Sequence, residues 1–233
     1  MNQIKSFKKI IMGWAMKLKK LKIKQKANKK NPFLETRDGF FVRQYNRRDE
    51  YIKHQQSKLP IMRWNLDESF KSRVDYFTNE FEALGAGNGR AILCLGARDG
   101  AEVYSLRKTG FLAIGIDLAY PLNNQFVHYG DFHNIPYPDD CFDFCYTNAL
   151  DHMLEPDKIF FEIRRVLKMG GVFNARIIKG SREGYSLLAG AHESFAWKEI
   201  GRLVSLIEKM GFKNTKKIDL DKNWTTFLFQ VIK

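Results

Sequence analysis

The stretch from Ala91 to Gly100, AILCLGARDG, decides the fold, because an apolar strand runs directly into a short turn that contains two glycines. A helix-like segment begins at Ala101, and the next apolar run, AIGID, ends on Asp117. A strand, a glycine turn, a helix and a second strand ending in an acid form the unit with which doubly wound α/β domains hold a nucleoside-containing ligand. The loop is not G-x-G-x-x-G, so the same letters also fit an ordinary buried strand and tight turn.

Strand-like and helix-like segments alternate beyond this unit to the end of the chain. The predicted strands cover residues 92–95, 112–116, 126–128, 142–147 and 172–178, and the predicted helices cover residues 101–109, 156–167 and 197–210. Residues 213–218 and 225–232 form a predicted closing hairpin. Such alternation produces a mostly parallel sheet with helices on both faces. We therefore expect an α/β fold with a doubly wound sheet and an antiparallel C-terminal hairpin.

A second group of motifs lies between Tyr129 and Phe173. In order, they are Gly130-Asp131, Ile135-Pro136-Tyr137, Phe142-Asp143, Leu150-Asp151-His152, and the run from Glu162 to Gly171. In this order and spacing the motifs resemble those of the class I S-adenosylmethionine-dependent methyltransferases, especially the type 11 group, over residues 91–233. The resemblance implies a Rossmann-like fold and an enzyme that uses S-adenosyl-L-methionine. Its acceptor would be an oxygen or nitrogen atom of a small, lipid-linked or otherwise membrane-associated molecule.

The resemblance also implies a cofactor site, because ligands of open α/β sheets bind at the carboxyl ends of the strands. Residues 96–100 would hold the methionine part, Asp117 the ribose, and Asp131 the exocyclic amine of adenine, with Phe132 packed on the base. Asn148 follows a strand and would touch the cofactor or the acceptor, or merely cap the turn. The complete set of expected cofactor residues is Gly96, Ala97, Arg98, Asp99, Gly100, Asp117, Leu118, Asp131, Phe132 and Asn148.

Two departures from the family pattern affect the glycine loop. Cys94 stands where the family has an acid, and Arg98 stands where it has the middle glycine. One interpretation is that Arg98 turns outward or pairs with the cofactor's carboxylate, while Asp99 or Glu102 supplies the missing acid near the ammonium group. The alternative is a non-catalytic domain that keeps the fold, has lost the ligand, and serves as an interaction or membrane-recruited module.

Asp151 and His152 are the candidate catalytic residues. Methyl transfer depends mainly on in-line positioning, and a base is needed only where the acceptor must lose a proton. The unperturbed pKa of histidine suits this role better than that of aspartate, although a histidine at this family position also packs structurally. We expect no metal site.

Composition bounds the domain organisation. A chain of 233 residues with 44% hydrophobic content supports one substantial α/β core. We expect an N-terminal arm at residues 1–30, a helical cap or substrate-shaping segment at 31–88, and the cofactor domain at 89–233. Within the cap, helices are predicted at 48–59 and 67–84; Tyr51, His54, Gln55 and Lys58 face either a site or solvent. Three cysteines without metal-like spacing indicate a reducing, cytoplasmic setting.

The arm carries most of the net charge of +13, since residues 1–30 hold eleven lysines and no acid. Apolar residues recur there at spacings of three and four and form one face of a predicted helix: Ile4, Phe7, Ile11, Trp14, Leu18 and Leu21. Such a helix suits an anionic membrane surface, which would make the protein peripheral at a membrane. Docking on the protein's own surface and nucleic-acid binding, as in an RNA methyltransferase guided by its arm, remain alternatives. The sequence leaves the oligomeric state open.

Overall fold

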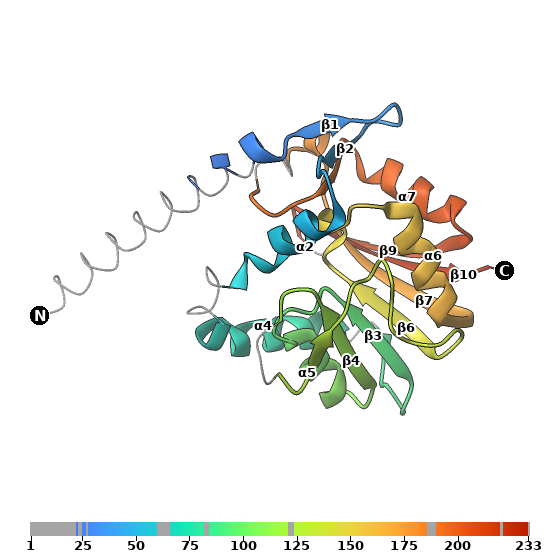
Figure 1. Ribbon diagram of the computed structural model, residues 1–233. Helices are drawn as coiled ribbons and strands as arrows, with labels where there is room; N and C mark the ends of the chain where they lie inside the picture. Colours follow the sequence, from blue (N-terminus) through green and yellow to red (C-terminus); the bar gives the residue numbers. More distant parts are fainter. Residues whose placement is uncertain are drawn as a thin grey trace, which may run out of the picture.

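The computed structural model describes residues 22, 25–26, 28–59, 66–81, 84–120, 124–185, 190–219 and 221–232. Most of the predicted basic arm and the segment from Pro60 to Trp64 lie outside these residues. The described chain forms a central sheet with helices on both faces and a smaller sheet beside it (Figure 1).

A seven-stranded sheet organises the molecule. Its strand order is β5 (Val127–Tyr129), β4 (Leu112–Asp117), β3 (Ala91–Leu95), β6 (Phe142–Thr147), β7 (Leu167–Ile178), β10 (Trp224–Val231) and β9 (Phe212–Asp219). The first five strands in this order are parallel, whereas β10 runs antiparallel to both of its neighbours. The predicted fold class is therefore confirmed, including the antiparallel C-terminal pair.

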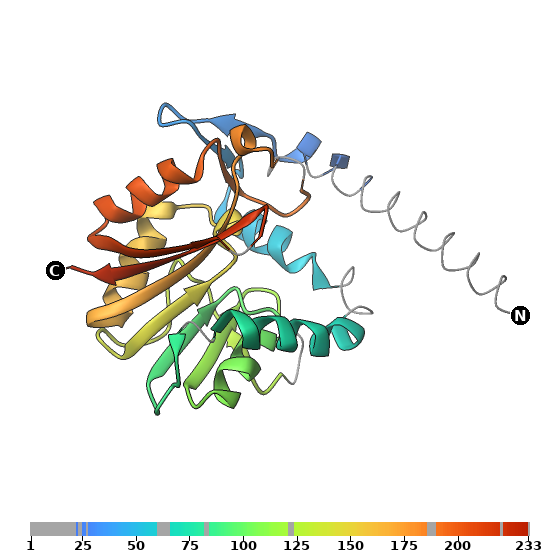
Figure 2. The same cartoon turned by 180° about the vertical axis from the view of Figure 1, so that it is seen from behind.

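Helices cover both faces of this sheet, as the two opposite views show (Figures 1 and 2). Residues of α6 (Pro156–Val166) and α7 (Ile200–Lys209) contribute to one apolar core, and residues of α4 (Leu66–Phe81) and α5 (Ala101–Lys108) contribute to the other. In α6 the buried apolar residues recur at spacings of three and four, which directs one stripe of the helix onto the sheet; they are Ile159, Phe160, Ile163 and Val166.

A three-stranded sheet lies beside the main one and was not predicted. It joins the hairpin of β1 (Phe33–Glu35) and β2 (Phe40–Arg43) to β8 (Phe195–Trp197), in antiparallel pairs such as Phe40 with Trp197. The strands are three or four residues long, and β8 pairs with a strand that is distant in the chain, so no local pattern indicates it. Trp197 therefore ends a strand instead of opening the predicted helix, and α7 begins at Ile200.

The helix α2 (Arg48–Gln56) follows β2, and its residues Tyr51 and Gln55 point inward. Tyr51 and Gln55 are buried, so this face is not the solvated surface that was one of the two sequence interpretations. Among the described helices, none is both long and apolar enough to cross a membrane.

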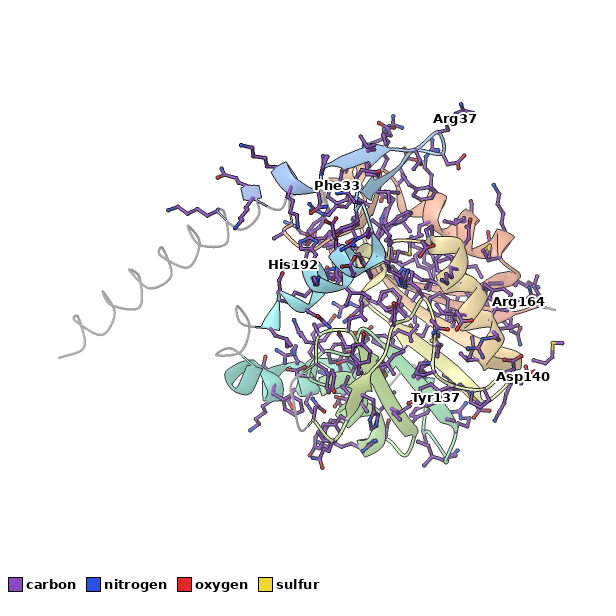
Figure 3. The ribbon with its side chains drawn as sticks, viewed as in Figure 1. Phe33, Arg37, Tyr137, Asp140, Arg164 and His192 are labelled. Carbon is purple, nitrogen blue, oxygen red and sulfur yellow. The ribbon has the colours of Figure 1, made fainter. Side chains whose placement is uncertain are left out.

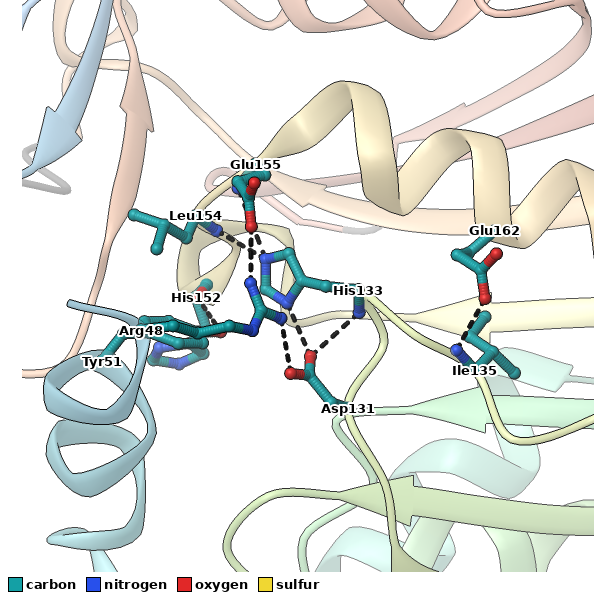
Figure 4. A network of polar contacts seen from close by, with 9 residues as sticks. All are labelled: Arg48, Tyr51, Asp131, His133, Ile135, His152, Leu154, Glu155 and Glu162. Carbon is teal, nitrogen blue, oxygen red and sulfur yellow. Dashed lines mark hydrogen bonds and ion pairs between the residues drawn. The ribbon is translucent and has the colours of Figure 1, made fainter.

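The motif residues Glu162 and Arg165 have a structural role. Glu162 accepts a hydrogen bond from the backbone amide of Ile135 at 2.7 Å (Figure 4). Arg165 donates to the carbonyl oxygens of Ile135 at 2.9 Å and Tyr137 at 2.8 Å and pairs with Glu162. These contacts fasten the loop after β5 to α6, and this loop leads back from the carboxyl edge of the sheet.

Candidate active site

The loop after β3 is shaped by glycine. Gly96 and Gly100 have φ values of 72° and 80°, in the left-handed region that favours glycine. A Cβ atom on Gly96 would lie 2.6 Å from the Cβ of Ala149, and one on Gly100 would lie 2.6 Å from the Cβ of Phe126. Arg98 adopts φ 46°, which also lies in the left-handed region. The loop therefore keeps a glycine-type path despite the substitution.

Asp117 ends β4 directly beside this loop. One of its carboxylate oxygens accepts the backbone amide of Arg98 at 2.8 Å, and the other accepts the amide of Ala119 at 2.7 Å. A carboxylate offers about four lone-pair positions, so Asp117 can still accept from two further donors such as vicinal hydroxyls. Ala97, in the turn after β3, and Leu118, in the turn after β4, are both buried.

Two more acidic residues, Asp99 and Glu102, lie near the loop, and their surroundings differ. Asp99 is buried and forms an ion pair with Arg73 of α4. Glu102, in the first turn of α5, is also buried, and its burial raises the pKa to about 7 against the opposing effects of its own backbone amide and Arg98. Cys94, at the family's acidic position, is buried, and this burial raises the pKa of its thiol well above the usual range.

Asp131 lies at the centre of a polar network after β5 (Figure 4). One oxygen accepts the backbone amide of His133 at 2.9 Å and its Nδ1 at 2.6 Å, and the other accepts Arg48 at 2.6 Å. Burial alone would raise the pKa of Asp131, but the hydrogen bonds from His133 and Arg48 outweigh it and lower the pKa to about 2. The carboxylate is therefore ionised and has one acceptor position left, on the oxygen that faces Arg48.

His133 and Phe132, the neighbours of Asp131 in the chain, make structural contacts. His133 donates through Nδ1 and accepts the amide of Leu154 on Nε2 at 3.1 Å, so it is a neutral structural residue. Phe132 is only 6% exposed and stacks on His133 with ring centroids 5.1 Å apart. Its ring is thus part of the core, and packing on an adenine would be limited to its exposed edge.

Asp151 and His152 lie in the turn after β6, as the sequence motif indicated. Nδ1 of His152 donates to the carbonyl oxygen of His192 at 3.0 Å, which leaves Nε2 as a lone pair 3.8 Å from the Asp151 carboxylate. Burial raises the pKa of Asp151 to about 6, partly offset by the charge of Lys58. Burial, assisted by Lys58, lowers the pKa of His152 to about 4. The structure thus reverses the expected order, and Asp151 has the pKa closer to neutrality.

Lys58 connects the two halves of the site. Burial lowers the pKa of its ammonium group, while the charges of Asp117, Asp151 and Glu193 raise it. Lys58 follows α2 directly, and it was named from the sequence only as a member of a helical face.

A hydrogen-bonded chain joins α2 to the loop before β8. His54 donates from Nε2 to the carbonyl oxygen of Ala191 at 2.8 Å and accepts the Tyr45 hydroxyl on Nδ1 at 2.7 Å. Gln55 donates to the carbonyl oxygen of His192 at 2.8 Å, and His192 stacks on His54 beside α2 (Figure 3). Burial lowers the pKa values of His54 and His192 to about 4 and about 3, so both are neutral at pH 7.

Arg43 secures the same loop from the other side. It is fully buried in β2 and donates to the carbonyl oxygens of Glu193 at 2.7 Å and Asn31 at 2.9 Å. The loop that carries His192 is therefore held between α2 and the small sheet. No sequence motif marks Arg43, Arg48, Tyr45 or Ser194, because each has a partner more than eighty residues away. An arginine amid apolar residues in FFVR was the one available signal.

The expected residues thus gather at one edge of the sheet. The loop 96–100, Asp117 and Asp131 lie along the carboxyl ends of β3, β4 and β5, and Asn148 follows β6. Asn148 is partly exposed, consistent with any of its three sequence interpretations. Within the described part of the chain, no three His, Cys, Asp or Glu side chains gather to hold a metal ion.

Comparison with solved structures identifies the fold. The 1,6-didemethyltoxoflavin-N1-methyltransferase of Burkholderia thailandensis, solved with 1,6-didemethyltoxoflavin and S-adenosylhomocysteine, is 12% identical with a TM-score of 0.63, over 87% of this chain and 99% of that chain. Geranyl diphosphate C-methyltransferase from Streptomyces coelicolor A3(2) is 12% identical with a TM-score of 0.55, over 70% and 76%. A SAM-dependent methyltransferase from Aquifex aeolicus is 20% identical with a TM-score of 0.53, over 67% and 89%. The fold is that of the class I methyltransferases.

Sequence comparison identifies a domain within the chain. The family model described as a methyltransferase domain matches residues 83–175, which contain the glycine loop, Asp117, Asp131 and the Asp151-His152 turn. No curated protein sequence matches the chain. Residues 83–175 of this chain therefore carry a methyltransferase domain, within a fold of the class I type.

Proposed function

We propose that this enzyme transfers the methyl group of S-adenosylmethionine to an oxygen or nitrogen of a small-molecule acceptor bound between α2, the turn at 150–152 and the loop at 190–194. The observation that carries the proposal is the place of Asp151 and His152 in the turn after β6, at the same edge of the sheet as Asp117, with the Asp151 carboxylate 3.8 Å from Nε2 of His152. The two named relatives act on very different acceptors, so the choice of acceptor rests on this chain's own residues.

The residues of the loop fit the cofactor. Gly96 and Gly100 allow close approach of the backbone, and Asp117 retains acceptor positions for two hydroxyls. Asp131 retains one acceptor position for the exocyclic amine. When bound, the cofactor supplies an electrophilic methyl group on a positively charged sulfur. Binding and alignment of this group are the main contributions that the protein makes to the rate.

The roles of Asp151 and His152 follow from the proton that the acceptor must lose. An acceptor that must lose a proton as it takes up the methyl group would pass that proton to Asp151. A carboxylate with a pKa of about 6 is ionised at pH 7 and close enough to neutrality to accept that proton. His152, fixed by the carbonyl oxygen of His192, offers Nε2 as a second acceptor that orients the reacting group.

Calorimetric titration with S-adenosylmethionine and S-adenosylhomocysteine tests the first part of this proposal. We expect micromolar binding that is retained by Asp75→Ala, a change on the exposed face of α4. Transfer of a labelled methyl group to a panel of phenols, carboxylic acids and amines tests the second part. Binding without transfer to any O or N acceptor, but with transfer to carbon, would contradict the acceptor assignment; no heat with either ligand would contradict the whole proposal.

We further propose that the enzyme is cytoplasmic and that residues 1–30 hold it peripherally on anionic membranes. Support comes from the sequence alone, in which eleven lysines accompany one apolar helical face. Each lysine near such a surface contributes about 1 kcal/mol, and the apolar face enters the interface. A membrane-associated acceptor would then be concentrated near the site.

Vesicle sedimentation tests the arm. The full chain should sediment with vesicles containing phosphatidylserine and remain in solution with phosphatidylcholine alone, and deletion of residues 1–30 should abolish sedimentation. An equal affinity for structured RNA, lost in the same deletion, would favour the RNA methyltransferase alternative instead. Retained sedimentation of the shortened chain would contradict a role for the arm.

A further inference from the structure

A cavity of about 590 Å³ lies at the end of the main sheet that is formed by β7, β10 and β9, opposite the end at β5. It opens where α7 begins and where β7 and β9 end (Figure 1). None of its described lining residues belongs to the cofactor side or the acceptor side of the site above. Small-molecule sites in proteins typically occupy about 300–1,000 Å³, so this cavity has the volume of a separate ligand site.

The floor of the cavity is apolar. It is formed by Ile200 and Val204 of α7 and by Phe227 of β10, all of which belong to or pack against the core on this face of the sheet. Ile200 and Phe227 are buried, and Val204 is half-buried, so the floor is the edge of that core. An apolar group that covers this floor would lower the free energy by removing apolar surface from water.

Gly201 lines the cavity in the first turn of α7. A Cβ atom at this position would have no other atom within 4 Å, and the backbone is outside the left-handed region. Neither packing nor backbone geometry therefore requires glycine here, although glycine is a poorer helix former than alanine. A side chain at position 201 would narrow the cavity, and glycine leaves it open.

Charged side chains of both signs surround the apolar floor, namely Lys179, Glu183, Lys217, Asp219 and Asp221. Lys217 and Asp219 form an ion pair, with Nζ and Oδ2 3.4 Å apart. Glu183 and Asp221 each accept two backbone amides on one oxygen, at 2.8 and 2.9 Å for Glu183 and at 2.7 and 3.1 Å for Asp221. A carboxylate has about four lone-pair positions, so both acids can accept further hydrogen bonds on the second oxygen. The cavity therefore offers acceptors for a cation and, at Lys179, an ammonium group for an anion.

We infer that this cavity binds a small zwitterion with an apolar part, of the class of the apolar α-amino acids. The apolar side chain of the ligand covers the floor, its carboxylate pairs with Lys179, and its ammonium group donates to Glu183 or Asp221. A ligand with a single charge would satisfy one set of these groups and place its charge beside like charges of the other set. This binding function is additional to methyl transfer and does not depend on the cofactor.

Three probes that share a phenyl ring test the assignment by calorimetry and nitrogen-15 NMR titration of the full chain. L-phenylalanine carries both charges, 2-phenylethylamine carries only the ammonium group, and 3-phenylpropanoate carries only the carboxylate. Gly201→Leu fills the cavity, and Lys179→Met removes the positive charge. Lys209→Met, on the exposed surface of α7, is the matched control.

We expect L-phenylalanine to bind with a millimolar Kd and to shift the amide signals of residues 200–204 and 225–227. Each analogue with a single charge should bind about fivefold more weakly. Lys179→Met should raise Kd for L-phenylalanine about tenfold, as for loss of one charge-assisted hydrogen bond, and leave Kd for 2-phenylethylamine unchanged. Gly201→Leu should abolish binding of all three probes, and Lys209→Met should behave as the wild type.

Thermal melting separates loss of the cavity from loss of the fold. Leucine is a better helix former than glycine, so Gly201→Leu should melt at or above the wild-type temperature; Lys179→Met tests the same site without a change in α7. Equal affinities of the wild type for L-phenylalanine and 3-phenylpropanoate would overturn the zwitterion assignment. Unshifted signals around the cavity with every probe at tens of millimolar would overturn the site itself. Kd for S-adenosylhomocysteine should be the same in every variant, and a difference in Gly201→Leu would overturn the separation of this cavity from the cofactor site.

Discussion

The two halves of the active site are built in different ways. On the cofactor side, Asp117 and the glycine loop belong to consecutive strand ends of one parallel sheet, and their hydrogen bonds join residues fewer than twenty positions apart. On the acceptor side, His152 and His192 are held by α2 and the small sheet, through contacts such as Tyr51 to His152 and Gln55 to His192 that span more than a hundred positions. The cofactor side is therefore formed by the strand ends of the main sheet, whereas the acceptor side depends on α2 and the small sheet packed around it.

The largest expected effect tests the acceptor side alone. Asp151→Asn should lower kcat about a thousandfold, since a positioned base contributes typically 10² to 10⁴, while Kd for S-adenosylhomocysteine stays within twofold. Because Asp151 must be ionised, wild-type kcat/KM should rise with pH to a plateau above about 6, and the variant should lose that rise. Steady-state kinetics across pH 5–8 with the acceptor found by the panel measures both. A matching loss of cofactor affinity would show that the halves are not separate.

Asp117→Ala tests the cofactor side. Loss of hydrogen bonds to a charged acceptor should raise Kd for S-adenosylhomocysteine about a hundredfold, at about 1.5–3 kcal/mol for each bond. Calorimetry measures the change in Kd. Asp117→Asn keeps one acceptor oxygen, so its Kd should lie between those of the wild type and Asp117→Ala. Equal binding by Asp117→Ala and wild type would remove Asp117 from the site.

Gln55→Leu weakens the packing of the acceptor side without touching the sheet. Loss of its bonds to His192 and Ser194 should lower the free energy of unfolding by about 1–2 kcal/mol and raise the acceptor's KM about tenfold. Urea unfolding and kinetics measure these effects, and Lys53→Leu on the exposed face of the same helix is the control. Weaker binding of S-adenosylhomocysteine by Gln55→Leu would contradict the independence of the two halves.

Arg48→Gln cuts a contact that crosses between the halves, and its effect should be the smallest. Arg48 is partly exposed, so its ion pairs with Asp131 and Glu155 contribute about 0–1 kcal/mol. Removing it frees one oxygen of Asp131, and binding of S-adenosylhomocysteine should tighten by up to about fivefold. Calorimetric titration of Arg48→Gln with S-adenosylhomocysteine determines whether the affinity rises or falls, and Arg47→Gln serves as an exposed control. Weaker binding would assign Arg48 to the adenine site.

The same contrast explains what the sequence could predict. The strands β3 to β7, the closing hairpin and the acids after β4 and β5 follow from runs of apolar residues and turn signals, which are local. The strands β1, β2 and β8 are too short for such a pattern and exist because Phe40 and Trp197 meet across the fold. The reversed pKa order of Asp151 and His152 could not be predicted either, since it depends on burial in the folded chain and on the charge of Lys58, which is distant in the sequence.

Arg43 gives the N-terminal arm a mechanical link to the acceptor pocket. Its guanidinium joins the carbonyl oxygen of Asn31, the residue directly after the arm, to that of Glu193, beside His192. Its hydrogen bonds are accepted by the backbone carbonyl oxygens of Glu193, Asn31 and Gly190. The residue after the arm and the loop that orients His152 are therefore held by one side chain, through two hydrogen bonds.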